Sequence, residues 1–204
     1  MGGGCVNLTF SGREMRDLAV AWVALGVAFA LFFAGGDPFR LLEQGLVSGL
    51  VVSLLTAGVG FLLHELGHKV VAVHYGQVAE FRADYSMLLL ALLSAFLGFI
   101  FAAPGAVHHR GMLTNRQHGL IALAGPAVNV ALALLFIPLA LSVPAGGFLA
   151  EVANLGVIIN LFLAAFNMIP FGPLDGRKVF GWSKIIYVVF TVPTVGVTAL
   201  LLFF

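Results

Sequence analysis

Long apolar runs constrain this chain more than any other feature of its sequence. A helix needs about 20 mostly apolar residues to cross the hydrocarbon core of a bilayer. Lipid offers the backbone no hydrogen-bond partners, so such segments cross as helices. The sequence therefore predicts an all-α polytopic membrane protein with about five to six transmembrane helices. The apolar segments are residues 18–34, 46–75, 86–103, 120–143, 152–169 and 185–204.

The scarcity of charge excludes several other classes of protein. Charged residues make up 9% of the 204 residues, against about 25% in soluble domains. With a net charge of +1, the chain is neither disordered nor a candidate for nucleic-acid binding. A single cysteine, Cys5, cannot form an intrachain disulfide. We expect residues 1–17 to form a polar N-terminal leader and residues 18–204 to form a single transmembrane domain.

The basic residues indicate how many of these segments cross. If residues 86–103 dip into the bilayer and return, the ten basic residues divide nine to one between the two sides. If that segment crosses fully, the division becomes four to six, which the positive-inside rule disfavours. The sequence thus predicts five crossings, a cytoplasmic N-terminus, and a re-entrant or hairpin element at 86–103. On the cytoplasmic side lie Arg13, Arg16, Lys69, Arg82, Arg110, Arg116, Arg177, Lys178 and Lys184, and on the other side lies Arg40.

The second apolar segment carries ionisable residues, which are costly within a membrane and indicate function. His64, Glu65 and His68 stand in the run His-Glu-Leu-Gly-His. Residues four apart share one face of a helix, so both imidazoles can bind one metal ion, typically zinc. Glu65 is then placed to act as a general base. The alternative, that the histidines cap or pack a helix, is weaker because it buries three polar groups without partners.

A catalytic zinc ion needs a third protein ligand, and Asp175 is the main candidate. It follows the fifth apolar segment, in a stretch where Pro170 and Pro173 interrupt the helix. With five crossings, Asp175 and His68 both lie towards the cytoplasmic side, where they can share an ion. Asp-Gly is also a common turn sequence, so the spacing alone leaves the role of Asp175 open.

Together these motifs resemble those of the site-2 proteases, the intramembrane zinc metalloproteases of regulated intramembrane proteolysis. The resemblance is to compact prokaryotic forms without a PDZ domain, and it covers residues 46–176 as the catalytic core. It implies one Zn²⁺ ion bound by His64, His68 and Asp175, with Glu65 as the catalytic base and Asn167 as a substrate-binding residue. The matching motifs are His64-Glu-Leu-Gly-His68, Gly125-Pro126-xx-Asn129 and Asn167-xx-Pro170-xxxx-Asp175-Gly176.

The resemblance also implies a reaction and a location. The expected reaction is hydrolysis of a peptide bond within or near the transmembrane segment of a membrane-protein substrate. That substrate is expected to be a single-pass protein already cut by another protease, within the lipid bilayer of the cell membrane. The active site is expected to lie towards the cytoplasm.

Three other functions compete with this one. A non-hydrolytic pseudoprotease or a metal transporter can use the same helical scaffold. A transporter more naturally carries acidic residues on several helices, and here the spans contain almost none besides Glu65. A prenyl-protein (CAAX-type) membrane protease takes its third ligand from a later glutamate, and neither Glu80 nor Glu151 is well placed for that role.

Overall fold

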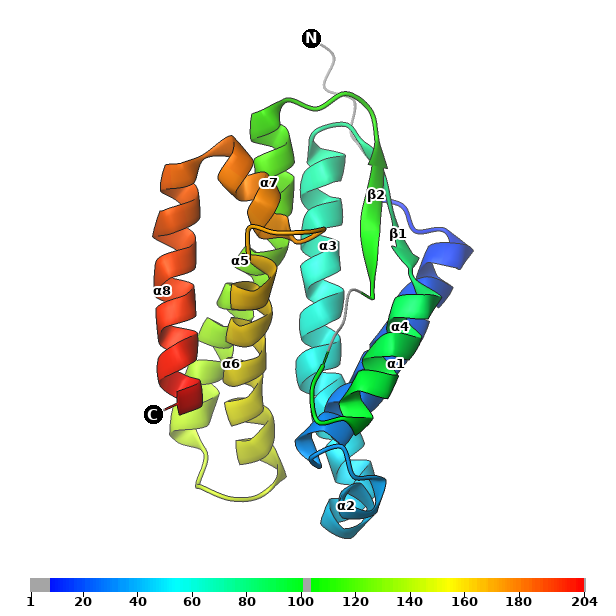
Figure 1. Cartoon of the computed structure of the whole chain (residues 1–204), viewed down its shortest axis with the longest axis vertical. Helices are drawn as coiled ribbons and strands as arrows, with labels where there is room; N and C mark the ends of the chain where they lie inside the picture. The colour runs from blue at the N-terminus through cyan, green and yellow to red at the C-terminus, as the bar shows by residue number, and fades with distance from the viewer. Residues whose placement is uncertain (1–7, 101–103, 204) are drawn as a thin grey trace.

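The computed structural model describes residues 8–100 and 104–203 of the chain. In these ranges five apolar helices are long enough to cross a membrane, so the all-α membrane class is confirmed (Figure 1). Helix α1 begins within the predicted leader, of which residues 1–7 lie outside the described ranges. The five are α1 (Gly12–Phe33), the continuous helix Pro38–His74, α5 (Asn115–Ser142), α6 (Phe148–Asn167) and α8 (Lys184–Phe203).

The continuous helix Pro38–His74 departs from regular α-helical geometry in two places. It consists of α2 (Pro38–Ser53), the π-helical turn η1 (Leu54–Gly58) and α3 (Val59–His74). Gly45 breaks α2 with a φ of 103°, a conformation that glycine adopts without steric cost. At the π-helical turn, Trp22 of α1 donates from Nε1 to the Leu54 carbonyl oxygen at 3.1 Å. Helix α3, which carries the His-Glu-Leu-Gly-His run, begins directly after this π-helical turn.

A two-stranded sheet and a short helix follow α3. Strand β1 (Val78–Ala83) pairs antiparallel with β2 (Gly105–Arg110), and α4 (Tyr85–Phe96) lies between them in sequence. The register places Ala83 opposite Gly105, so the chain leaves the sheet and returns to it at the same level. With 12 residues, α4 is about 18 Å long, too short to cross a bilayer core of about 30 Å.

This unit coincides with the element predicted at 86–103, of which residues 101–103 lie outside the described ranges. The sheet itself was not predicted. Entry of α4 into the bilayer stays a prediction. The length of α4 and the pairing of β1 with β2 determine how the chain leaves and rejoins the sheet, but they do not determine how deep α4 lies in the bilayer.

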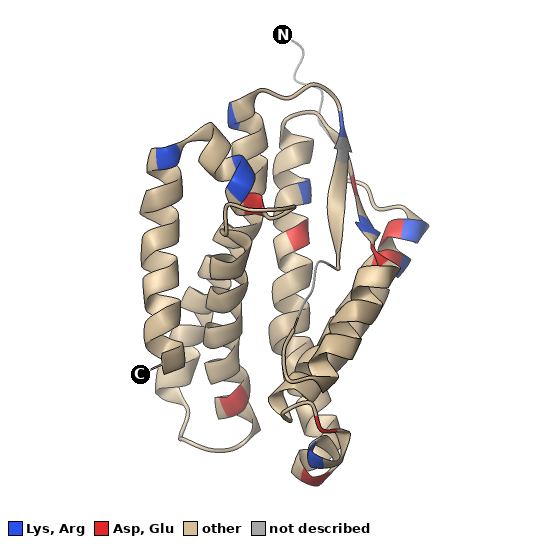
Figure 2. Ribbon diagram, in the orientation of Figure 1, with Lys and Arg blue, Asp and Glu red and all other residues tan. Residues whose placement is uncertain are grey.

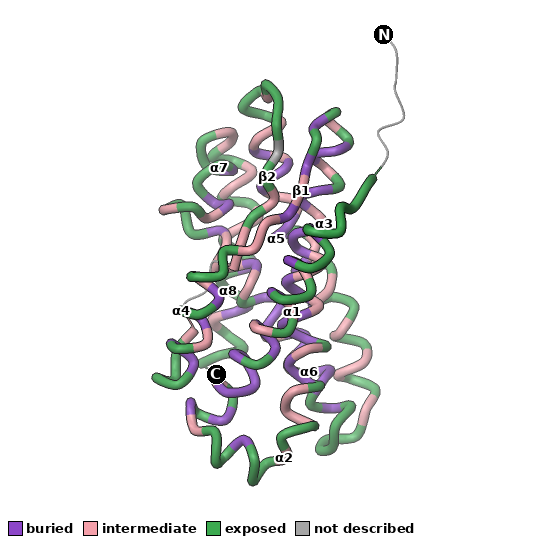
Figure 3. The backbone as a smooth tube through the Cα atoms, turned by 90° about the vertical axis from the view of Figure 1, so that its right-hand side faces the viewer, coloured by how far each residue is buried: buried purple, intermediate pink, exposed green. Residues whose placement is uncertain are grey.

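Helix α5 is the centre of the bundle and packs against α3, α6 and the short helix α7 (Asp175–Trp182). Its N-terminus carries a capping box, in which Thr114 and Gln117 each accept a backbone N–H of the other. This box explains why α5 begins five residues before the apolar segment at 120–143. Figure 3 shows the buried residues gathered between the helices, with exposed residues along the outer faces. Outward apolar side chains such as Leu135 and Val189 suit contact with lipid.

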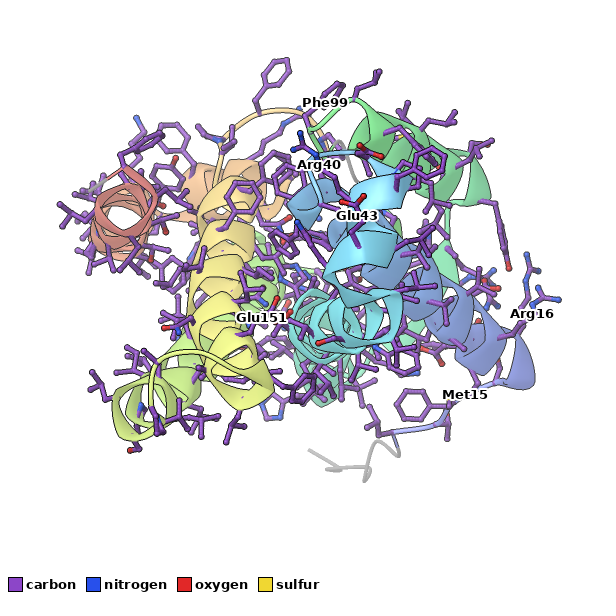
Figure 4. The ribbon with its side chains drawn as sticks, turned by 90° about the horizontal axis from the view of Figure 1, so that it is seen from below. Met15, Arg16, Arg40, Glu43, Phe99 and Glu151 are labelled. Carbon is purple, nitrogen blue, oxygen red and sulfur yellow. The ribbon has the colours of Figure 1, made fainter. Side chains whose placement is uncertain are left out.

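The charges divide between the two ends of the bundle. Figure 2 shows the Lys and Arg residues concentrated towards the end that carries the start of α1, the sheet and α7. Helix α2 lies at the opposite end, and the view from below in Figure 4 shows its Arg40 and Glu43. The grouping of basic residues at one end is the pattern on which the five-crossing prediction depends.

Candidate metal centre

Three predicted ligands converge at one point in the bundle. His64 and His68 lie one turn apart on α3, and Asp175 is the first residue of α7. The two histidine Nε2 atoms are 3.0 Å apart. Oδ2 of Asp175 lies 3.3 Å from Nε2 of His64 and 3.1 Å from Nε2 of His68. All three side chains are buried. The structure thus brings Asp175 to the histidine pair, as the sequence predicts.

The other nitrogen of each imidazole contacts an outer group. Nδ1 of His64 lies 2.6 Å from Oδ1 of Asn129, and Nδ1 of His68 lies 2.7 Å from the Ile121 carbonyl oxygen. Nδ2 of Asn129 donates to the Gly60 carbonyl oxygen at 3.1 Å and to Oδ1 of Asn160 at 2.9 Å. Because these partners are acceptors, the amide nitrogen of Asn129 must point towards them and its oxygen towards His64. Each Nδ1 therefore donates a proton, so in the neutral imidazole each Nε2 can offer its lone pair to an ion.

This donor set fits a zinc ion. The two Nε2 atoms and a carboxylate oxygen face one another at 3.0–3.3 Å. With both imidazoles neutral, each Nε2 offers its lone pair to a cation that lies among the three atoms. Ligands held about 2.0–2.1 Å from a tetrahedral zinc are roughly 3.3–3.4 Å from one another, close to the separations seen here. Two histidines and one carboxylate are also a common ligand set for catalytic zinc, which keeps its fourth position open.

Gly125 of α5 leaves the space in front of the two histidines. A Cβ atom at this position would lie 2.6 Å from Nε2 of His64 and 2.5 Å from Nε2 of His68. Any residue other than glycine would therefore place atoms where an ion must bind. In the sequence, Gly125 was marked only as part of the Gly125-Pro126-xx-Asn129 motif. The structure shows that the group it faces is the ligand pair itself.

Glu65 lies beside the ligand atoms. One of its carboxylate oxygens is within 4.8 Å of the ligand atoms of His64 and His68. Its Oε2 atom is buried and has no hydrogen-bond partner among the described residues. A buried carboxylate oxygen left unpaired is costly, so this atom has the properties of a group reserved for a reaction.

A cleft of about 170 Å³ joins these residues, which is room for several water molecules. Asn167, the last residue of α6, lines this cleft but contacts none of the three ligands. Its Nδ2 donates to the Leu163 carbonyl oxygen at 2.9 Å, which leaves the amide oxygen available. The opposite wall is formed by the start of β2, including Gly105 and Val107.

The competing third ligands lie elsewhere. Glu80 of β1 pairs with Arg82 at 2.6 Å and accepts a hydrogen bond from the Ser11 hydroxyl. That hydrogen bond, together with Arg82, holds the pKa of the Glu80 carboxyl below its ordinary value. Glu151 lies in the first turn of α6, at the end of that helix remote from Asn167. Neither glutamate shares the site of the two histidines.

Comparison with known proteins decides the family. "Putative zinc metalloprotease MJ0611" of Methanocaldococcus jannaschii is 40% identical over 196 residues, which cover 95% of this chain and 97% of that protein. The chain belongs to the site-2-protease-like zinc metalloproteases.

Two further relatives share less sequence identity with this zinc metalloprotease. "Putative zinc metalloprotease YwhC" of Bacillus subtilis is 29% identical over 161 residues, covering 70% of this chain and 72% of that protein. "Zinc metalloprotease MJ0392" of Methanocaldococcus jannaschii is 27% identical over 174 residues, covering 84% of this chain and 45% of that protein. No family model and no solved structure matches the chain.

Membership makes this chain a metallo-hydrolase with zinc as its cofactor. The binding of the ion by His64, His68 and Asp175 stays a prediction, which the geometry supports. Two partners of the ligands were not assigned from the sequence. The Ile121 carbonyl is a backbone group that every residue carries, so no sequence signal marks it. Asn129 was marked only as part of the Gly125-Pro126-xx-Asn129 motif, and that spacing was the signal that could have linked it to His64.

Proposed function

We propose that this zinc metalloprotease hydrolyses a peptide bond within or next to the transmembrane segment of a membrane-protein substrate. The observation that carries the proposal is the position of the donor set: three buried ligand atoms converge inside a bundle of membrane-spanning helices. A buried carboxylate and a cleft with room for water lie beside them.

Each residue of the site has a role that its position supports. His64, His68 and Asp175 hold the ion, which when bound polarises a carbonyl group and acidifies water. Glu65 takes the proton of the attacking water at Oε2 and returns it to the departing amine. The free amide oxygen of Asn167 binds a backbone N–H of the substrate beside the scissile bond.

A transmembrane helix must unwind before it can be cut, because its carbonyl groups are occupied by its own hydrogen bonds. The cleft offers extended walls to such an unwound strand. Gly105 to Val107 of β2 form one wall, and Pro173 and Leu174, next to Asn167, form the other. The substrate lies in the cleft as an extended chain within reach of Glu65.

The active site faces the cytoplasm in this proposal. The end of the bundle rich in Lys and Arg carries α7, whose first residue is Asp175, and basic residues prefer the cytoplasmic side. The substrate is a single-pass membrane protein that another protease has already shortened, because a narrow cleft between helices admits a trimmed segment more readily than a folded domain. The enzyme resides in the cell membrane, where it reaches this substrate through the lipid.

The test uses a tagged single-pass probe protein whose membrane segment contains a central Gly-Gly pair, co-reconstituted with the enzyme in vesicles. The pair weakens the helix locally, and a matched probe with Leu-Leu at the same place is the control. We expect cleavage of the Gly-Gly probe and slower cleavage of the Leu-Leu probe. Glu65→Gln should retain zinc and lose cleavage by roughly 10²–10⁴-fold. Asp175→Ala should lose both zinc and cleavage.

Two results contradict the proposal. Cleavage retained in Glu65→Gln refutes the role of Glu65 as base. Zinc bound stoichiometrically by the wild-type chain, with neither probe cut, favours the pseudoprotease or transporter alternative.

A further inference from the structure

Lys69 directly follows the metal-binding His68, yet it points to a different part of the molecule. Its side chain is 2% exposed. The Nζ atom contacts Oε1 and Oε2 of Glu14 at 2.7 and 2.5 Å and donates to the Thr9 carbonyl oxygen at 2.6 Å. It also lies 4.0 Å from the centre of the Phe10 ring. Each of these partners belongs to residues 9–14, so the start of α1 is fixed to the catalytic helix α3.

Glu14 has a second function besides this ion pair. Its Oε1 accepts the backbone N–H of Phe81 in β1 at 3.0 Å. One turn further along α1, Asp17 accepts the N–H of Ala83 at 3.4 Å and the hydroxyl of Tyr85 at 2.8 Å. Met15 and Arg16, which lie between the two acids, point away from the bundle (Figure 4).

The two amides lie on one edge of β1. Successive backbone N–H groups of a strand point to opposite edges, so those of Phe81 and Ala83 point the same way. The other edge of β1 pairs with β2. Two carboxylates of α1 therefore cover the outer edge of the sheet, where a further strand would otherwise bind.

A buried ion pair is weak evidence for stability, because the loss of hydration offsets the attraction between the charges. Its best-attested use is to select one arrangement of the elements that it joins. We propose that Glu14, by accepting the Phe81 N–H, is a positioning residue that fixes the β1–β2 sheet relative to the metal ligands and so sets the substrate-binding wall of the cleft. This inference rests on the proposed function, because it assigns β2 to the binding of the substrate.

The connection to the cleft runs through the register of the sheet. Phe81 is opposite Val107 and Ala83 is opposite Gly105, and both partners line the cleft. A shift of β1 away from α1 therefore moves the cleft wall. The outer contacts of the two histidines come from α5 and that of Asp175 comes from α7, so these contacts do not involve the sheet. Loss of the Glu14 contact should then weaken substrate binding and leave zinc in place.

Two double variants separate this positioning role from the ion pair. Glu14→Gln/Lys69→Met removes both charges but keeps an amide oxygen that can accept the Phe81 N–H. Glu14→Met/Lys69→Met also removes both charges and has no acceptor. Neither variant leaves an unpaired buried charge, so both avoid the main cause of misfolding. Zinc content and thermal unfolding are measured for each.

Two readouts follow the cleft wall. The first is KM and kcat for the Gly-Gly probe. The second is the rate at which a water-soluble maleimide labels Ala106→Cys on β2, in a chain whose one native cysteine is replaced by Cys5→Ser. Labelling needs no proteolysis, so it tests the positioning role even if the probe is not cut.

We expect Glu14→Met/Lys69→Met to raise KM and the labelling rate by about fivefold, the change that corresponds to the loss of one hydrogen bond. Its kcat and zinc content should stay close to those of the wild type. Glu14→Gln/Lys69→Met should match the wild type in both readouts. Equal labelling rates in the two double variants overturn the inference, and so does a loss of zinc parallel to the loss of activity. Labelling that changes as expected while the wild type cuts no probe refutes the proposed function alone.

Discussion

Replacing Gly125 by alanine tests whether His64 and His68 bind the ion through their Nε2 atoms. The added Cβ would lie 2.6 and 2.5 Å from these two atoms. Favourable contacts between such atoms begin at about 3.5 Å, so each imidazole would have to retreat by about 1 Å. Helices α3 and α5 pack directly against each other, which limits any retreat of the backbone.

A displacement of this size is large for a metal site. Zinc ligands keep their distances to within about 0.2 Å, so a shift of 1 Å removes both histidines from the ion at once. We expect Gly125→Ala to bind zinc about tenfold more weakly or worse, and to lose cleavage in proportion. Overpacking of this kind costs about 1–3 kcal/mol of folding free energy, which a bundle of this size should tolerate.

Zinc per chain is measured by mass spectrometry after purification in mild detergent, and helix content is measured by circular dichroism. Gly181→Ala is the matched control, because a Cβ at that position of α7 meets nothing within 4 Å. The control should keep its zinc and its activity. Stoichiometric zinc and undiminished cleavage in folded Gly125→Ala would refute binding through the two Nε2 atoms.

Three further outcomes are expected. Asn129→Ala removes the acceptor that orients His64, so zinc affinity should fall about 10–100-fold, as measured by competition with a chelating dye. An unchanged affinity would show that this contact does not orient the ligand. Asn167→Ala should reduce turnover of the Gly-Gly probe more than zinc content, and equal losses of both would argue that Asn167 supports the metal instead. Removal of zinc by a chelator should abolish cleavage and lower the unfolding temperature, and added Zn²⁺ should restore both. An unfolding temperature that does not respond to the chelator would contradict a buried zinc ion that links α3 and α7.

The sequence predicted the parts of the structure that depend on side-chain pattern. Apolar length identified six segments, five of which correspond to the long helices, and the spacing of His64 and His68 placed both on one face of a helix. The spacing alone left the role of Asp175 open, and the fold brings this residue to His64 and His68. The parity of the crossings was the argument that placed it at the right end of the bundle.

The parts that were not predicted depend on the backbone or on long-range contacts. The β1–β2 sheet joins two short strands across an apolar helix, and neither strand has a strong alternation of polar and apolar residues. Glu14 and Asp17 were assigned to a polar leader. No local feature of the sequence shows that a residue near the N-terminus will contact Lys69. Such contacts span more than 50 residues, and sequence periodicity is informative only over a window of about 11–18 residues.

The site is assembled from four elements that do not form a unit without one another. Helix α3 supplies both histidines, α5 fixes the direction of their lone pairs, α7 supplies the carboxylate, and α6 ends where Asn167 lines the cleft. The contacts of the two histidines with α5 turn their Nε2 atoms towards Asp175, so the packing of these helices keeps the three ligands close before zinc binds. A substitution that loosens α5 or α7 should therefore appear first as a loss of zinc affinity and only later as a loss of fold.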